Sequence, residues 1–157
     1  MFRAVLETKP AMDALAAIAD RARDLRPAWR AVVAYLRAAT IQQFASQGGR
    51  LGTPWQPLSP AYAIAKARKY PGQPILRATD AMFNSLAGQT ADSVVEIEPQ
   101  VMSYGTKDRK AHWHQYGTTR MPARKILGLI AQDKQMVKSI VKDHLANQLR
   151  ATGFEVV

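Results

Sequence analysis

Two of the three histidines in this chain are the first residues whose chemistry could define a site. His112 and His114 lie two positions apart, so on a strand they would share one face and present two imidazoles to a metal ion. A stable zinc site needs at least a third ligand and partners that orient the imidazoles. His144 is distant in sequence, and no carboxylate cluster accompanies the pair. We therefore expect hydrogen-bonded histidines in a structured loop and no metal site.

A glycine-rich run from Gly48 to Gly52 is the second candidate, because such turns can cradle phosphate. A P-loop places Lys and then Ser or Thr directly after its last Gly, on a helix that follows a strand. Here Thr53 and Pro54 come next, and the apolar spacing before the run indicates a helix. These differences argue against a phosphate-binding loop.

Acid–base and nucleophilic chemistry also lacks support in the sequence. Asp20 and Asp24 lie one helical turn apart but alternate with Arg21 and Arg23, which is typical of a solvated helix face. No Gly-x-Ser-x-Gly elbow occurs, and the absence of cysteine excludes thiol chemistry, disulfides and Cys-type zinc sites. We expect a protein that is not an enzyme and that has no catalytic residues and no cofactor.

Composition limits the class of protein. A chain of 157 residues is expected to form a single domain over 1–157 and to bury a core without disulfides. The net charge is +10, from 22 Lys and Arg against 12 Asp and Glu, which permits contact with DNA or with acidic protein surfaces. The cations are dispersed, whereas a nucleic-acid reader more often concentrates them beside stacking residues. No apolar run reaches the length of a membrane span or of a signal peptide, so we expect no membrane association.

The elements that must position any site are mainly helices. Apolar spacing, with Pro and Gly at the boundaries, predicts helices over 10–24, 27–47, 60–68, 80–86 and 133–149. Residues 93–98 are rich in β-branched side chains, and a Pro-Gln turn allows 101–104 to return beside them as a hairpin. Short strands are predicted at 2–7 and 154–157. Several helices packed on a small antiparallel sheet define an α+β fold.

Two local expectations follow from these elements. Thr79 is a suitable N-cap for the 80–86 helix, because its hydroxyl can accept a hydrogen bond from an unpaired backbone N–H. The helical and alternating spacings also predict the core, which comprises Leu15, Ile18, Val33, Leu36, Phe44, Trp55, Leu76, Leu86, Val95, Ile97, Val137, Ile140, Val141 and Leu145.

The irregular segment between the second and third helices holds one large aromatic residue. Trp55 has no catalytic chemistry, so we expect it to anchor this loop on the core, together with Pro57 and Ser59. Ser59 can accept hydrogen bonds from backbone N–H groups in the next helical turn, and Pro60 has a φ suited to the first helical position. A loop of about a dozen residues is long enough to suggest a tertiary anchor or a function.

This segment opens an ordered series of motifs that resembles the phage virion morphogenesis family, whose members are tail-completion or head–tail joining proteins. Asp80 stands where the family prefers Gly, and Lys110-Ala111 stands where it usually has Tyr-Ala. The residues that fit the family pattern are Gly52, Trp55, Pro57, Leu58, Ser59, Lys66, Ile75, Leu76, Arg77, Thr79, Ser85, Leu86, His114, Gln115, Tyr116, Gly117, Ala123, Arg124, Leu127 and Gly128.

The resemblance implies a structural component at the neck or upper tail end of a tailed-phage virion, assembled in the host cytoplasm. Such proteins form rings around the DNA channel; we expect six-fold rather than twelve-fold closure and contacts with neighbouring neck or tail proteins. Rings use head-to-tail contacts between subunits. The residues expected at these contacts lie in an exposed basic loop over 105–110 and the aromatic segment after it, and they are Lys107, Arg109, Lys110, Trp113 and Tyr116.

Two other functions are alternatives to a structural ring component. A basic nucleic-acid-binding module would use the dispersed cations on phosphates and would lose affinity steeply as salt rises. A hydrolase that acts during assembly would need a pocket with perturbed titratable groups, which the sequence does not suggest.

Overall fold

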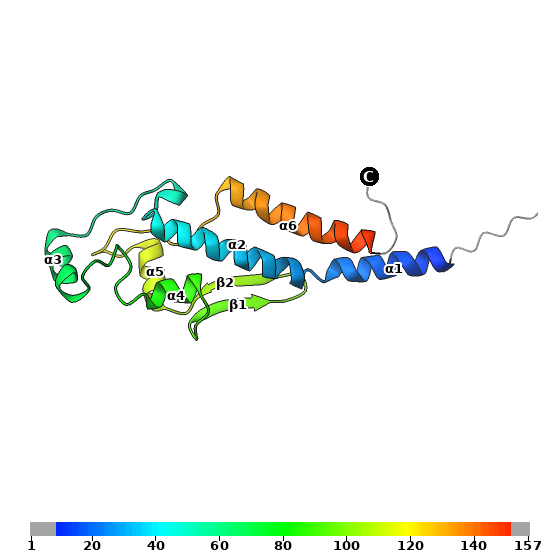
Figure 1. Cartoon of the computed structure of the whole chain (residues 1–157), viewed down its shortest axis with the longest axis horizontal. Coiled ribbons are helices and arrows are strands. Elements are labelled where there is room, and N and C mark those ends of the chain that lie inside the picture. Colours follow the sequence, from blue (N-terminus) through cyan, green and yellow to red (C-terminus); the bar gives the residue numbers. More distant parts are fainter. Residues whose placement is uncertain (1–8, 152–157) are drawn as a thin grey trace, which may run out of the picture.

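The structure, a computed structural model, describes residues 9–151 (Figure 1). The strands predicted at 2–7 and 154–157 therefore lie outside the described residues, and so do the side chains of Leu15 and Ile18. The described chain combines helices with a two-stranded antiparallel sheet, so the predicted α+β fold class is confirmed. None of the helices in this part of the chain is both long enough and apolar enough to cross a membrane.

Two long helices form the spine of the molecule. α1 (Lys9–Arg23) and α2 (Arg26–Ala45) are separated at Asp24-Leu25, and Pro27 lies in the first turn of α2, where its missing N–H costs nothing. The N–H of Leu25 donates to the carbonyl of Pro99 at 2.8 Å, which ties this junction to the turn of the hairpin. α6 (Ala131–Arg150) runs beside α2, and α1 extends beyond the body (Figure 1).

The predicted hairpin is also confirmed. β1 (Ser93–Ile97) pairs antiparallel with β2 (Met102–Thr106), with Val95 opposite Tyr104. α2 and α4 (Ala81–Ala87) contact these strands, and the Tyr104 hydroxyl donates to the carbonyl of Leu86 at 2.7 Å. The hairpin is thereby fixed to both helices rather than left as an isolated two-stranded ribbon, which would be marginal in water.

The predicted basic loop over 105–110 is largely wrong. β2 continues to Thr106, and α5 (Arg109–Tyr116) begins three residues later, so only Lys107 and Asp108 connect them. The Asp108 carboxylate accepts from the N–H of Lys110 at 2.9 Å and caps the helix. Two of the three predicted loop cations therefore lie in the first turn of a helix.

The predicted cap at Thr79 is wrong as well. Asp80 occupies the N-cap position of α4, with a left-handed φ of 58° and no side-chain bond to the helix. Its carboxylate instead accepts two hydrogen bonds from Arg77, at 2.8 and 3.0 Å. A left-handed φ is the conformation that Gly adopts without steric cost and that Asp tolerates better than most residues. This explains why the family pattern has Gly where this chain has Asp80.

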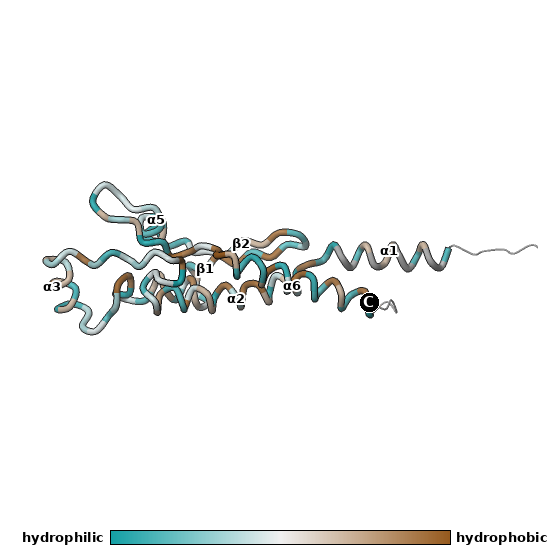
Figure 2. The backbone as a smooth tube through the Cα atoms, turned by 90° about the horizontal axis from the view of Figure 1, so that it is seen from above, coloured by the Kyte–Doolittle hydropathy of each residue, from teal (hydrophilic) through white to brown (hydrophobic). Residues whose placement is uncertain are grey.

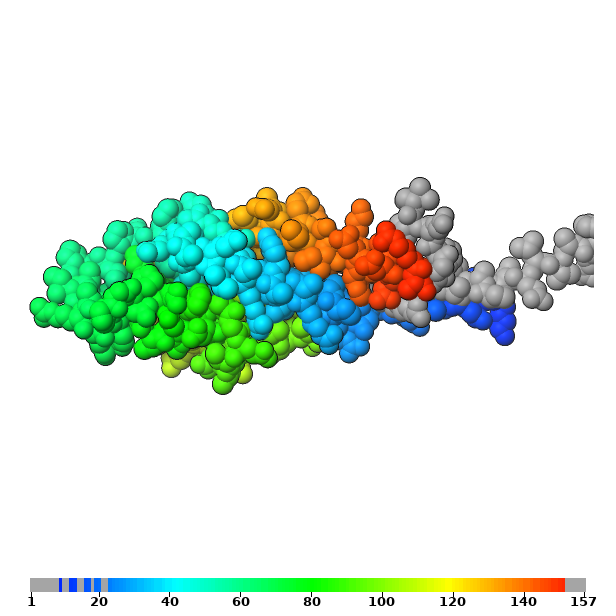
Figure 3. Space-filling model, in the orientation of Figure 1, coloured from blue at the N-terminus to red at the C-terminus, as the bar shows by residue number. Residues whose placement is uncertain are grey.

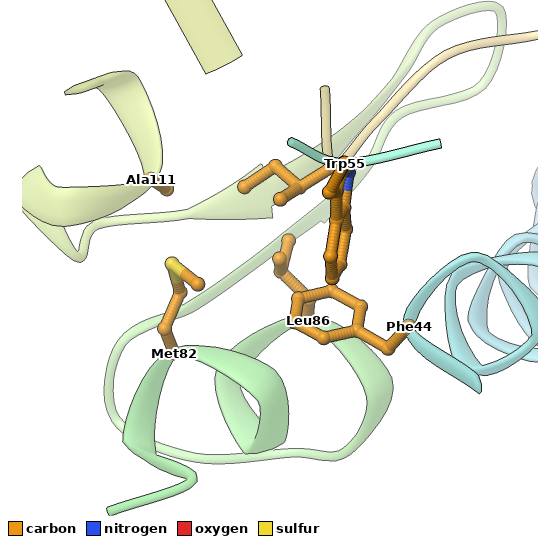
Figure 4. Close-up of a cluster of buried hydrophobic side chains, with 6 residues drawn as sticks. Phe44, Trp55, Met82, Leu86 and Ala111 are labelled. Carbon is orange, nitrogen blue, oxygen red and sulfur yellow. The ribbon is translucent and has the colours of Figure 1, made fainter. Parts of the chain in front are cut away.

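The buried core lies where α2, α4, α5 and the loop segments meet (Figure 4). The rings of Phe44 and Trp55 are 5.3 Å apart and nearly perpendicular, which is a favourable edge-to-face arrangement. The cluster consists of Phe44, Trp55, Met82, Leu86, Ala111 and Ile126. Of the predicted core, Phe44, Trp55, Leu86 and Val33 are buried.

The apolar face of α6 differs from the prediction, because its residues are only half-buried. α6 packs against α2 along one side, and among the described residues only Asp133 of this helix is fully buried. The half-buried predicted core positions are Leu36, Leu76, Val95, Ile97, Val137, Ile140, Val141 and Leu145. The strongly hydrophobic stretches lie along α2, α6 and the hairpin (Figure 2), within an elongated envelope (Figure 3).

Candidate functional site

Trp55 comes from the irregular segment between α2 and α3 (Pro60–Lys69) and packs in the buried core cluster. Its side chain is 6% exposed, and its indole N–H donates to the carbonyl of Lys125 at 2.9 Å. Gly48 makes this packing feasible: it has a φ of 95°, and a Cβ there would lie 2.5 Å from Cδ1 of Trp55. The glycine-rich run thus accommodates an indole ring and is not built as a phosphate loop.

Four polar side chains hold the irregular segments around Trp55 by bonding to their backbones; we call Gln43, Lys66, Gln115 and Arg124 the backbone clamps. Gln43 bonds to Lys125 O and Leu51 N, at 2.7 and 3.1 Å. Gln115 accepts from the N–H groups of residues 126 and 127 and donates to the carbonyl of 127. The segment 124–130 has no strand partner, so these side chains satisfy buried backbone groups that would otherwise be costly.

Arg124 and Lys66 act in the same way on two other loops. Arg124, 5% exposed, donates to the carbonyls of Gln56 and Pro57 at 2.9 and 3.1 Å. Lys66, 7% exposed, donates to the carbonyls of Gln73 and Pro74 at 2.6 and 2.5 Å. Burial lowers the pKa of both side chains. Their hydrogen bonds explain why a loop-anchoring motif would contain charged residues.

The two remaining residues of the predicted loop anchor, Pro57 and Ser59, are exposed. Pro57 contributes its carbonyl to Arg124. Ser59 is the N-cap residue of α3, but its side chain accepts no hydrogen bond from the helix, so that expectation is wrong. Its backbone carbonyl accepts from the N–H of Ala63 at 2.8 Å and starts the helix.

A pocket of about 560 Å³ opens between these loops, α3, α4 and α5. Its walls carry one carboxylate, Asp80, and a set of cations drawn from four separate segments, namely Lys66, Arg77, Lys110, Arg120 and Arg124. We call it the cationic pocket. Sequence reasoning missed it because the cations are dispersed along the chain; the signal available was that the family motifs contain Lys66, Arg77 and Arg124.

His114 also lines the cationic pocket. Burial, reinforced by the charge of Arg124, lowers its pKa, so its imidazole is neutral at physiological pH. His112 is exposed and its ring lies 4.9 Å from that of Tyr116. The two histidines lie on a helix rather than on a strand, so they do not share a face. No group of three metal-binding side chains occurs in the part of the chain that the structure describes.

The predicted interface residues are divided between two surfaces. Arg109, Trp113 and Tyr116 are spaced along one face of α5 and are exposed, the two aromatics by 45% and 72%. Lys110 lies on another face and lines the cationic pocket. Lys107 is exposed, and its N–H donates to the carbonyl of Asp92 at 2.8 Å.

A second concave region, of about 360 Å³, is an apolar groove between α2, β2, α6 and the segment 126–129. Its walls include Leu36, Leu129 and Val137. The guanidinium of Arg50, which also lines the groove, and the Tyr35 hydroxyl both donate to Asp133, which is 0% exposed. Burial alone would raise the pKa of Asp133, but its hydrogen bonds from Arg50, Tyr35 and the N–H of Ile130 together lower that pKa.

Comparison with known proteins assigns the chain to a family. The model of the phage virion morphogenesis family matches residues 6–146, a span that includes all the backbone clamps and both concave regions. Searches of curated proteins and of solved structures give no match. The match covers most of the chain, and the chain therefore belongs to the phage virion morphogenesis family.

Proposed function

We propose that this protein is a structural ring component at the neck or upper tail end of a tailed phage, where it acts in tail completion and head–tail joining. The observation that carries the proposal is the family match over residues 6–146, because this family serves virion morphogenesis. Six-fold closure is favoured over twelve-fold.

The surface of the subunit supports assembly. Val137, Ile140 and Leu145 remain half-buried along α6, and Val137 also lines the apolar groove. Several large apolar side chains are exposed on other elements, among them Tyr62, Ile64 and Tyr116. A second copy of the chain could bury such partly exposed apolar side chains and the groove.

We also propose that the protein is not an enzyme. Three of the five cations of the cationic pocket are engaged in holding the fold: Lys66 and Arg124 bond to loop carbonyls, and Arg77 pairs with Asp80. A catalytic acid or base must be free to exchange protons with a substrate. Side chains that are hydrogen-bonded to backbone carbonyls stabilise the fold and are poorly suited to proton transfer.

In the assembled particle, the ring would surround the DNA channel and contact neighbouring neck or tail proteins after assembly in the host cytoplasm. The net charge of +10 suits proximity to DNA or docking onto acidic neighbours. This proposal places the function in subunit interfaces rather than in the chemistry of a pocket.

Light scattering on the purified protein and a map of the assembled particle test this proposal. We expect a discrete oligomer in solution and the subunit at the neck or upper tail end of the virion. A nucleic-acid-binding module would instead remain a monomer and bind DNA with an affinity that falls steeply as salt rises. A protein that is absent from purified virions would contradict the structural role.

A further inference from the structure

We propose that the cationic pocket receives the acidic hairpin β1–β2 of a neighbouring copy of this chain, and that this contact joins subunits head to tail. The inference rests on the proposed function, because it requires copies of the subunit to assemble. It identifies the two complementary surfaces, which the family match does not.

The positive charges on the walls of the pocket outnumber the negative ones. Asp80 is the one carboxylate on its walls, and it is already paired with Arg77. Lys110 and Arg120 are exposed at the pocket, and neither is needed to hold a loop carbonyl. The nearest carboxylate to Lys110 is Asp108, with Nζ and Oδ2 4.0 Å apart, which is a weak contact. The pocket therefore has cationic groups available for an anionic partner.

The size of the pocket favours carboxylates over nucleic-acid phosphates. A volume of about 560 Å³ accommodates a few side chains of a protruding turn. Duplex DNA is much wider than such a pocket, and proteins that bind DNA contact many phosphates across an extended surface. An acidic protein segment is thus the better occupant.

The acidic segment that fits is in this chain. Neither Lys nor Arg occurs between Arg77 and Lys107, whereas Asp92, Glu96 and Glu98 do. Glu96 and Glu98 are exposed, and two-residue spacing places them on the same face of the hairpin. Within the described residues neither carboxylate forms an ion pair. The hairpin therefore presents unpaired negative charge.

Apolar side chains accompany the charges on both surfaces. Val101 in the hairpin turn is 59% exposed, and Tyr62 on the wall of the pocket is 55% exposed. An apolar contact next to charge pairs would give the interface the buried centre that stable association requires, with the ion pairs fixing its register.

The placement of the two surfaces suits a ring. The hairpin turn lies at the junction of α1 and α2, where Leu25 N bonds to Pro99 O, and the pocket lies at the opposite end of the body beside α3 (Figure 1). Different surfaces at opposite ends give a head-to-tail contact, which repeats from subunit to subunit and closes by rotation. Hydrogen bonds hold the backbone of both surfaces, from Leu25 N to Pro99 O at the hairpin turn and from Arg124 to the carbonyls of Gln56 and Pro57 at the pocket.

Charge reversal tests the contact. We expect Lys110→Glu with Arg120→Glu, and separately Glu96→Lys with Glu98→Lys, to weaken self-association by about tenfold or more, measured by light scattering across protein concentrations. Combining all four changes reverses both surfaces and is expected to restore the oligomer. Arg68→Glu with Lys69→Glu on α3 makes the same change in net charge at the same end without touching the pocket wall, and is expected to leave the oligomer intact. Circular dichroism checks that each variant is folded.

The outcomes separate this inference from the proposed function. If the wild-type protein forms an oligomer and both reversal pairs keep it, the inference is wrong while the ring proposal stands. If each pair abolishes the oligomer but the combination does not restore it, the hairpin and the pocket do not meet. If the pocket reversal removes DNA binding and leaves the oligomer unchanged, the pocket binds phosphate. A wild-type protein that stays a monomer contradicts both proposals.

Discussion

The surroundings of Trp55 and the apolar face of α6 differ in how far this protein buries their side chains. Around Trp55, two irregular segments contribute Trp55 and Ile126 to a closed cluster with residues of α2, α4 and α5, and polar side chains such as Gln43 and Gln115 bond to the loop backbones. Along α6, a regular helix of 20 residues leaves Ile140 and Leu145 half-buried. Regular secondary structure does not by itself bring burial here: the cluster around Trp55 is closed, whereas the apolar face of α6 is only half-buried.

The largest expected effect is in the cluster around Trp55. Trp55→Ala should lower the free energy of unfolding by about 3–5 kcal/mol, because it leaves a cavity beside Phe44 and removes the hydrogen bond to Lys125 O. Trp113→Ala, at a position that is 45% exposed, serves as the control and should cost far less. Chemical denaturation of both variants makes the measurement. Equal losses of unfolding free energy in the two variants would show that the buried Trp55 stabilises the fold no more than the exposed Trp113.

The next largest effect on stability is expected at the start of α6, where Asp133 accepts hydrogen bonds from Tyr35 and Arg50. Asp133→Asn should lower stability at neutral pH by about 1–3 kcal/mol, because buried donors lose their charged acceptor. Asp143→Asn, on an exposed position of the same helix, is the matched control. Urea denaturation compares the two variants. An unchanged free energy of unfolding for Asp133→Asn would show that these hydrogen bonds contribute little to stability.

The lowered pKa of Asp133 also gives a pH dependence. The folded protein binds the proton of this carboxyl less readily than the unfolded chain, so the stabilisation is fully present above about pH 4 and is lost as pH falls through the folded pKa. The Asn variant should lack this part of the acid sensitivity. Thermal melts of wild type and variant over a pH series measure it; parallel curves for the two proteins would contradict the assignment.

A smaller effect is expected on α6. Ile140→Ala should cost about 1–2 kcal/mol in the isolated subunit, below the 2–5 kcal/mol of a fully buried site, because the side chain is half-buried. If another copy covers this face, the loss should grow with protein concentration as the oligomer forms. Melts at several concentrations make the comparison. A loss as large as that of Trp55→Ala at low concentration would show that the apolar face of α6 is already buried.

The smallest effect on stability concerns the exposed cations near α5. Changing Lys107, Arg109 and Lys110 together to Glu should alter the free energy of unfolding by about 0.5 kcal/mol or less per residue, because exposed ion pairs contribute little. The same triple variant should block assembly of phage particles. Melting temperature and particle yield are the two measurements. A normal yield from a folded triple variant would count against an interface role for these residues.

The sequence predicts those parts of the fold that depend on neighbouring residues. The boundaries of α2 and α3 follow from Pro27 and Pro60, and the hairpin follows from the β-branched run before the turn at Pro99. Thr79 shows the limit of local rules: it is a good cap by type, but the pairing of Arg77 with Asp80 holds the chain in a different conformation.

The candidate site was less accessible to prediction. The cationic pocket brings together residues as distant in sequence as Lys66 and Arg120, and periodicity carries no information about such contacts. The resemblance named several of its residues without their roles. The structure supplies those roles, since Lys66 and Arg124 bond to loop carbonyls.

The hydrogen bonds to Lys125 O and Asp133 constrain the order in which this protein can fold. Gln43, Trp55 and Arg50 find these partners 82, 70 and 83 positions further along the chain. During synthesis, α2 and the hairpin can form early, but the indole of Trp55 has no acceptor until the segment 124–133 has left the ribosome. Contacts of such wide separation slow folding, because loop closure must precede them. Folding should therefore finish late, with the C-terminal segment closing over residues made long before it.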